Sequence, residues 1–60
     1  MATYKPGETV PTSGIYAELS IYNVKQTEVT CVKKEPFPPT KGGGYHYELV
    51  RAAAHRRSEG

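Results

Sequence analysis

The clearest feature of the chain is an alternation of apolar and polar positions over residues 15–22. Because successive side chains of a β-strand point to opposite faces, a period of two indicates a strand with one apolar and one polar face. We expect this strand to begin directly after Gly14. Its apolar face would carry Ile15, Ala17, Leu19 and Ile21, and its polar face Tyr16, Glu18, Ser20 and Tyr22.

A second strand is predicted over residues 27–33, which are rich in β-branched side chains. Val29 and Cys31 share one face of this stretch, and Glu28, Thr30 and Val32 share the other. Residues 23–26 form the expected turn between the two segments. The second strand should therefore pair antiparallel with the first.

The segment 35–40 contains three prolines, each of which lacks an amide donor and fixes φ near about −65°. We predict an ordered, extended loop here, with Phe37 packing on the sheet as its anchor. The consecutive glycines of residues 41–44 indicate a turn, and the alternation over residues 45–51 predicts a third strand. Its two faces would carry Tyr45, Tyr47 and Leu49 on one side and His46, Glu48 and Val50 on the other.

The predicted fold class is mostly β, with a small three-stranded antiparallel meander over residues 15–51. Residues 1–14 are expected to form an irregular arm that packs on the sheet, because proline and glycine turn signals interrupt them. Residues 52–60 are expected to form a basic, flexible tail. Its first residues favour helix by propensity, but so short a helix is not stable alone and should fray.

Size and composition limit the function classes. A chain of 60 residues forms one small domain, buries only about 60% of the surface exposed by its unfolded form, and has no room for a large enzyme with a deep cleft. Its single cysteine excludes an internal disulfide. No segment resembles a signal peptide or a membrane span, so we expect a cytoplasmic protein without membrane association.

The positive charge is concentrated at one end of the sequence. Residues 1–50 contain five lysines and five glutamates, whose charges cancel, so the net charge of +2 arises within residues 51–60. That stretch carries three arginines against one glutamate. Three arginines are fewer than the roughly 6–10 phosphate contacts of a strong nucleic-acid binder.

The residues capable of catalysis or metal binding are few. Cys31, His46 and His55 lack the paired spacing of a structural zinc site, and the chain contains no aspartate. Cys31 falls on the apolar face of a predicted strand, where a raised pKa suppresses the thiolate. The glycines of residues 41–44 match no phosphate-binding motif and precede a strand rather than a helix. We therefore predict a protein that is not an enzyme and has no catalytic, cofactor-binding or metal-binding residue.

The five tyrosines are the strongest indication of a binding surface, because tyrosine is enriched in protein interfaces. Two alternatives remain open for the polar face of the first strand. Its tyrosines could face a partner, or the arm, with Pro6, Val10 and Pro11, could cover them as a second small core. For the first alternative the candidate partner-binding residues are Tyr16, Tyr22, Tyr45, Lys33, Arg56 and Arg57.

The predicted function is a protein-interaction module that uses a tyrosine-bearing sheet face or an edge strand, with an unknown protein or a second copy as its partner. Weak nucleic-acid binding is the alternative, with tyrosines stacking on bases and the lysine and arginine side chains contacting phosphates. The glutamates spread through residues 1–50 disfavour that alternative.

Four short strings occur in an order that resembles a known family. They are KPGE at residues 5–8, PTSGIY at 11–16, FPPT at 37–40 and a final strand ending ELV at 48–50. Together they resemble the YjzC-like small bacterial proteins over residues 5–51. That family has no established activity, so the resemblance implies a bacterial protein and a fold.

The same layout resembles small zinc ribbons, in which SGxY leads into one CxxC knuckle and FPP into a second. The ligand positions of that pattern fall on Ala17, Ser20, Thr40 and Gly43, with Gly44 as the knuckle glycine. None of the four is a zinc ligand. The resemblance therefore implies a ribbon-like, metal-free fold held by turn glycines, prolines and the packing of Phe37.

Overall fold

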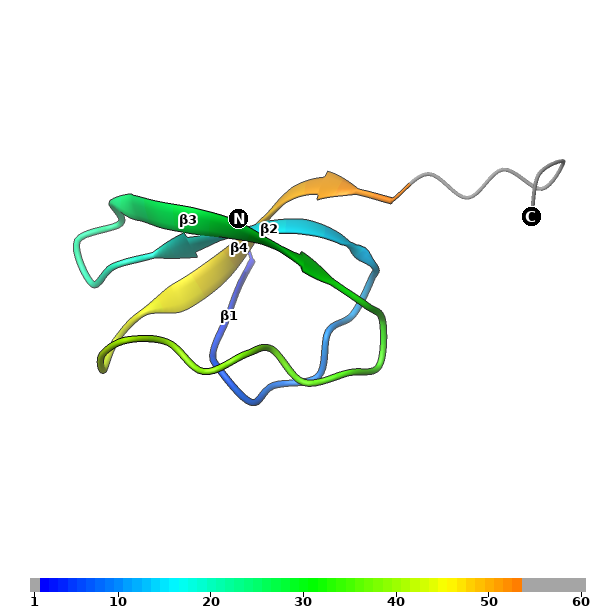
Figure 1. The fold of residues 1–60 in the computed structure, drawn as a ribbon, viewed down its shortest axis with the longest axis horizontal. Coiled ribbons are helices and arrows are strands. Elements are labelled where there is room, and N and C mark those ends of the chain that lie inside the picture. Colours follow the sequence, from blue (N-terminus) through cyan, green and yellow to red (C-terminus); the bar gives the residue numbers. More distant parts are fainter. Residues whose placement is uncertain (1, 54–60) are drawn as a thin grey trace, which may run out of the picture.

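A computed structural model of the protein describes residues 2–53, and within them it contains four strands and no helix. The strands are β1 (Thr3–Tyr4), β2 (Gly14–Leu19), β3 (Lys25–Cys31) and β4 (His46–Ala52). They form one antiparallel sheet in the order β1-β4-β2-β3 (Figure 1). The predicted mostly β class is confirmed. The predicted helical turn lies largely outside the described residues, and its first residue belongs to β4.

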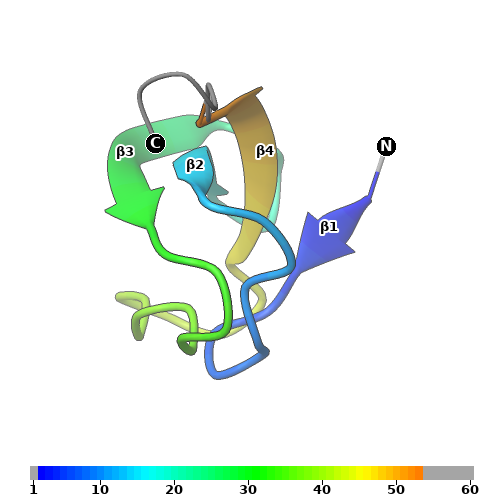
Figure 2. The ribbon, with the colours of Figure 1, turned by 90° about the vertical axis from the view of Figure 1, so that its right-hand side faces the viewer.

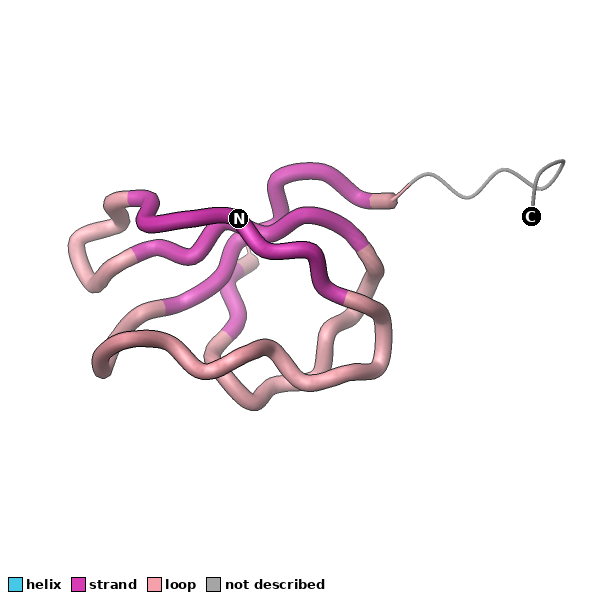
Figure 3. Tube along the Cα trace, viewed as in Figure 1, coloured by secondary structure: helices cyan, strands magenta, loops and turns pink. Residues whose placement is uncertain are grey.

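The order of the strands differs from the predicted meander. The central strand is β2, which pairs with both β3 and β4, and the arm contributes β1 as a fourth strand. The reason is the long loop of residues 32–45, which runs beneath the strands and returns the chain to the end where β3 began (Figure 3). Since β4 then runs in the same direction as β3, its antiparallel neighbour is β2.

The turn between β2 and β3 begins earlier than predicted. The Ser20 amide donates to the Val24 carbonyl at 2.9 Å, and the Asn23 amide donates to the Ser20 carbonyl at 2.8 Å. Asn23 adopts a φ of 63°, in the left-handed region that asparagine tolerates better than most residues. The strand predicted over residues 15–22 therefore ends at Leu19, and Ile21 lies in the turn.

The core lies on the face of the sheet that carries Tyr16 and Tyr47, which we call the inner face. Both side chains are buried, with 0% and 1% of their surface exposed. The opposite face, here called the outer face, carries Ile15, Ala17 and Leu19, the predicted apolar side of the strand. Ala17 and Leu19 are buried there but lie outside the cluster around Tyr16. Of the two alternatives left open above, the structure shows the second for Tyr16, since Val10 from the arm joins its cluster.

An aromatic cluster fills the inner face. The Phe37 ring stacks on Tyr4 and Tyr47 with centroid separations of 5.3 and 5.0 Å, and meets Tyr16 edge to face at 4.9 Å. Val10 and Cys31 complete the buried cluster. The predicted anchor of the proline loop therefore lies at the centre of the core, where aromatic pairs of this geometry are favourable.

The arm and the proline loop are joined to each other on the inner side of the sheet (Figure 2). The Gly7 amide donates to the Phe37 carbonyl at 3.0 Å, and the Phe37 amide donates to the Glu8 carbonyl at 2.9 Å. The Val10 amide likewise donates to the Glu35 carbonyl at 2.8 Å. Two loops that share hydrogen bonds act as one lid over the aromatic cluster.

The tyrosine hydroxyls fasten this lid to the sheet. Tyr16 donates to the Thr12 carbonyl at 2.6 Å, and Tyr47 donates to the Pro38 carbonyl at 2.8 Å. Buried tyrosines need such partners for their polar ends. The KPGE, PTSGIY and FPPT strings thus contribute residues to the core or its lid, which makes them signatures of the fold.

Candidate functional site

The first candidate surface is the free edge of β3, since no described strand pairs with its far side. One hydrogen bond next to the neighbouring strand β2 shows which backbone groups of β3 point away from the sheet. The Ala53 amide donates to the Ser13 carbonyl at 2.8 Å, so the backbone groups of Ser13 point toward β4. The direction of the backbone groups alternates along a strand. The amides and carbonyls of Gly14 and of every second residue after it therefore point toward β3.

The same alternation identifies the free backbone groups of β3. Cys31, Val29 and Thr27 pair with Gly14, Tyr16 and Glu18, so their amides and carbonyls face β2. Those of Glu28 and Thr30 consequently point outward, where a further strand could pair with them. A register shift opposite the end of β2 interrupts the ladder near Gln26, which confines the regular part of the free edge to residues 27–31.

A groove of about 540 Å³ adjoins this edge at the end of the sheet where β2 begins and β3 and β4 end, on the right-hand side of Figure 1. Strands β2, β3 and β4 all contribute to its walls. Val32, next to the edge, is 50% exposed. The lining residues that determine its character are Ile15, Cys31, Val32, Arg51, Ala52 and Ala53. Apart from Arg51, these side chains are apolar or a buried thiol. The hydroxyl side chains of Ser13 and Thr30 also line the groove, so its floor is mostly apolar and its margin is charged.

Gly14 allows β2 and β4 to approach closely at this groove. A Cβ atom at Gly14 would collide with the backbone oxygen of Arg51 and lie 2.9 Å from the Cα of Ala52. No side chain could be accommodated without moving one of the two strands. The absence of a side chain here brings Ala52 and Ala53 beside the start of β2.

The margin of the groove is basic. Arg51 lines it, and Lys33 and Lys34 follow Val32 directly in the chain, with all three side chains exposed. The Lys33 amide donates to the Ser13 hydroxyl at 2.9 Å, which fixes the chain beside the groove. Counting the neighbouring Glu35, the local charge is three positive minus one negative, or +2.

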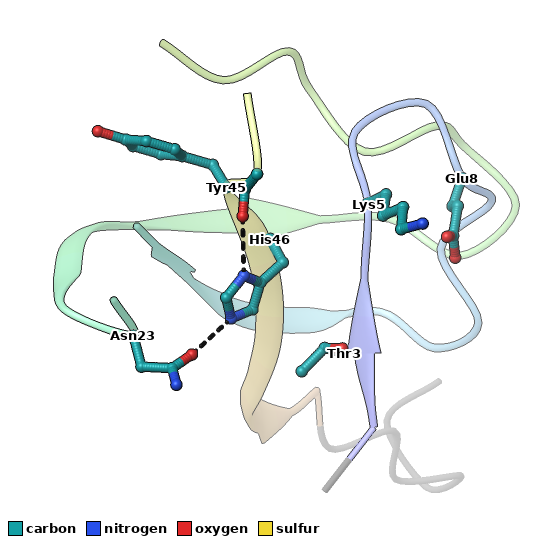
Figure 4. A pocket seen from close by; sticks show the side chains of 7 residues that line it. Thr3, Lys5, Glu8, Asn23, Tyr45 and His46 are labelled. Carbon is teal, nitrogen blue, oxygen red and sulfur yellow. Dashed lines mark hydrogen bonds between the residues drawn. The ribbon is translucent and has the colours of Figure 1, made fainter. Parts of the chain in front are cut away.

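A second pocket, of about 380 Å³, lies between the arm and the start of β4 (Figure 4). One ring nitrogen of His46 lies 2.9 Å from Oδ1 of Asn23, and the other lies 3.3 Å from the Gly44 carbonyl. Lys5 and Glu8, which have opposite charges, line its other side, while the Tyr45 ring points away from His46. The imidazole already contacts protein groups through both nitrogens, so we assign it to holding the turn against β4.

The predicted partner-binding residues do not come together. Tyr16 is fully buried, and the prediction that it contacts a partner is wrong, because its ring packs on Phe37 in the core. Tyr22 is 80% exposed in the turn, with Tyr45 half-buried at the same end of the sheet. Lys33 lies at the opposite end, beside the groove. The remaining two candidates, Arg56 and Arg57, lie outside the described residues.

Sequence reasoning missed the groove itself. Its walls come from three strands, and two of its lining residues, Ala52 and Ala53, were assigned to a tail. The available signal was the alternation of the third predicted strand. In the structure this strand continues to Ala52, with Val50 as one extra residue between the positions paired with Tyr16 and Ile15. Exposed apolar side chains in the β2–β3 turn were also unforeseen, because Ile21 was assigned to the apolar face of a strand and Val24 to the expected turn of residues 23–26.

The possible chemistry at Cys31 is limited by its surroundings. Burial raises the pKa of the Cys31 thiol, which favours the unreactive protonated form at neutral pH. Within residues 2–53 no group of three or more His, Cys, Asp or Glu side chains could hold a metal ion. Of the zinc-ribbon positions, Ala17 faces the outer side of the sheet, whereas the loop containing Thr40 covers the inner side.

The described part of the chain contains no helix long and apolar enough to cross a membrane. Comparison with family models, with curated proteins and with solved structures finds no match to this chain.

Proposed function

We propose that this protein is a non-enzymatic protein-binding module that takes up an extended segment of a partner along the free side of β3. The observation that carries the proposal is the continuity of two features. The outward backbone groups of Glu28 and Thr30 lead directly into the groove wall formed by Cys31 and Val32. Strand addition uses this combination, in which main-chain hydrogen bonds supply affinity and a pocket selects a side chain.

The dimensions support a short binding segment. The regular free edge spans residues 27–31, and a strand advances about 3.3 Å per residue, so an added segment of five to seven residues would cover the edge and reach the groove. Side chains on one face of such a segment are about 6.6 Å apart. One or two of them would therefore meet the groove, and the others would remain in solvent.

The structure gives less support to nucleic-acid binding. That hypothesis requires tyrosines and basic side chains on one surface, but Tyr16 is buried and Tyr22 lies at the opposite end from Lys33 and Lys34. Lys25 already pairs with Glu28 at 3.0 Å. We therefore favour an extended peptide as the ligand.

We also propose kinship with the YjzC-like bacterial proteins and a cytoplasmic location. The shared strings support this because they contain the buried residues Tyr16 and Phe37 and lie on both sides of the buried Val10. A family defined by those strings would share the lid and the aromatic cluster, while the residues around the groove could differ among its members.

The test uses peptides selected from a random displayed library and isotope-labelled protein. Amide shift changes should concentrate at Glu28, Thr30 and Val32. Thr30→Pro should abolish binding, because it removes an outward amide donor while leaving the hydrogen bonds to β2 in place. Tyr22→Ala, at the opposite end, is the matched control and should bind normally. Shift changes confined to the β2–β3 turn would overturn the proposal, even if Thr30→Pro failed to fold.

A further inference from the structure

We infer that the segment received beside β3 is acidic, with aliphatic side chains that enter the groove and carboxylates that contact its basic margin. This inference rests on the proposed function and adds the chemical class of the partner. Two independent properties of the groove carry it, namely its apolar walls and the cations around it, which form no ion pair within the described part of the chain.

The apolar walls favour an aliphatic side chain. Ile15 is half-buried, and Val32, Ala52 and Ala53 are exposed, so the groove presents apolar surface to solvent. Burying such surface against a complementary side chain is favourable in proportion to its area. A polar side chain packed on these four residues would lose its hydration without gaining a hydrogen-bond partner from them. Of the two hydroxyls that line the groove, that of Ser13 already accepts a hydrogen bond from the Lys33 amide.

Within residues 2–53 the cations at the margin have no ion-pair partner. The only ion pair within residues 2–53 joins Lys25 and Glu28, at the other end of β3. Arg51 pairs across the sheet with Ile15, and Ile15 pairs on its other side with Thr30. Neither Ile15 nor Thr30 has a carboxylate that could pair with Arg51 along this row of the outer face. A ligand carboxylate would therefore meet Arg51 and Lys33 without displacing an existing partner.

Charge also disfavours a second copy of this chain as the occupant. Two β3 edges could pair around a twofold axis with Glu28 opposite Glu28, which places like charges in direct opposition. Moving the axis to Val29 pairs Glu28 with Thr30 but brings Lys25 of one copy toward Lys33 of the other. A register centred on Thr30 would require the Val32 carbonyl, which already accepts a hydrogen bond from the Glu35 amide at 3.1 Å.

The experiment compares three blocked heptapeptides. The first is Glu-Glu-Val-Thr-Val-Glu-Glu, the second replaces every Glu by Gln, and the third replaces both Val by Ser. Fluorescence anisotropy at low salt should show the first binding at least about tenfold more tightly than either control, since complementary charge and apolar burial act together. Added salt should reduce the preference for the Glu peptide over the Gln peptide.

Protein variants locate the effect. Arg51→Gln combined with Lys33→Gln should remove most of the preference for Glu over Gln, while leaving the affinity for the Gln peptide unchanged. Lys5→Gln, at the distant polar pocket, is the matched control and should leave the preference intact. Because all three side chains are exposed, these variants should retain the wild-type melting temperature.

The outcomes separate this inference from the proposed function. If the Gln peptide binds at β3 as tightly as the Glu peptide, the acidic partner is wrong and the strand-binding function stands. If the library and all three heptapeptides fail to shift the amides of residues 27–32, both proposals are wrong. A dimer that protects Thr30 and Val32 from hydrogen exchange would identify a second copy as the occupant and overturn the inference.

Discussion

The two faces of β2 are buried in different ways. On the inner face Tyr16 packs among aromatic rings beneath two hydrogen-bonded loops. On the outer face Ala17 and Leu19 are 5% and 9% exposed, yet their cross-strand neighbours are polar or charged. Long polar side chains can cover small apolar ones with their aliphatic stems while keeping their ends in water. Low exposure therefore does not by itself identify a core.

The largest difference between the faces should appear on truncation. Phe37→Ala removes the ring that contacts Tyr4, Tyr16 and Tyr47, and a buried Phe→Ala change costs about 3–5 kcal/mol. In a domain of this size that loss is expected to abolish folding, which circular dichroism and the dispersion of amide resonances would show. Leu19→Ala should remain folded. If Leu19→Ala unfolds the protein and Phe37→Ala does not, the assignment of the core to the inner face is wrong.

Gly14 tests the packing of β2 against β4 at the end of the inner face. Gly14→Ala places a Cβ against backbone atoms, which have little freedom to move, and should cost about 1–3 kcal/mol through strain. Gly43→Ala is the matched control, since a Cβ there meets nothing within 4 Å. Urea denaturation of both variants measures the difference. Equal stability would contradict the close approach of the two strands.

Three inner-face groups make the protein sensitive to high pH. Burial raises the pKa of Tyr16 and Tyr47 above 10.0 and that of Cys31 above 9.0. The unfolded chain releases these protons at lower pH than the folded chain does, so their contribution to stability is present below pH 9 and is lost as pH rises through the folded-state values. The free energy of unfolding should decline from about pH 9 upward. Tyr47→Phe should flatten the decline, and an unchanged profile would contradict burial of its hydroxyl.

The comparison of faces also shows what a single sequence can supply. The alternation located the central parts of three strands, because the period of two is a local property. It could not reveal which face the loops would cover, because that depends on the path of residues 32–45 through space. The same loop decided the strand order. The sequence pattern favoured Ile15 and Leu19 for the core on hydrophobicity, whereas the lid covers Tyr16.

The candidate site was less predictable for a related reason. Lys33 and a free sheet edge were foreseen, since each depends on local composition or on strand number. The groove was not, because it requires Ile15, Val32 and Ala52 to meet from three strands. Tyr16 was placed among the binding residues because tyrosine is common in interfaces, although it is also suited to a core where its hydroxyl finds a carbonyl.

A buried carboxylate on the inner face provides a smaller test. Glu18 is 7% exposed, and its Oε2 atom is buried without a hydrogen-bond partner in the described part of the protein. Glu18→Gln replaces the carboxylate by a neutral group of the same shape, which removes the negative charge that acts on the Tyr47 hydroxyl. It should therefore lower the pKa of Tyr47, which burial raises and the Glu18 carboxylate raises further. Glu48→Gln, on the outer face, is the control and should leave the pKa of Tyr47 unchanged in a titration followed by tyrosinate absorbance. An unchanged Tyr47 pKa in Glu18→Gln would contradict the prediction.

The smallest expected change in stability is at the turn of residues 20–24, which connects β2 and β3. Asn23 combines a positive φ with a contact between Oδ1 and His46. Asn23→Gly keeps the backbone conformation and loses only the contact, so it should cost less than about 0.5 kcal/mol. Asn23→Ala loses both and should cost about 1 kcal/mol. Thermal denaturation of these two variants and of His46→Ala separates the contribution of the backbone conformation from that of the imidazole contact. Equal losses of stability in both Asn23 variants would assign the stabilisation to the imidazole contact alone.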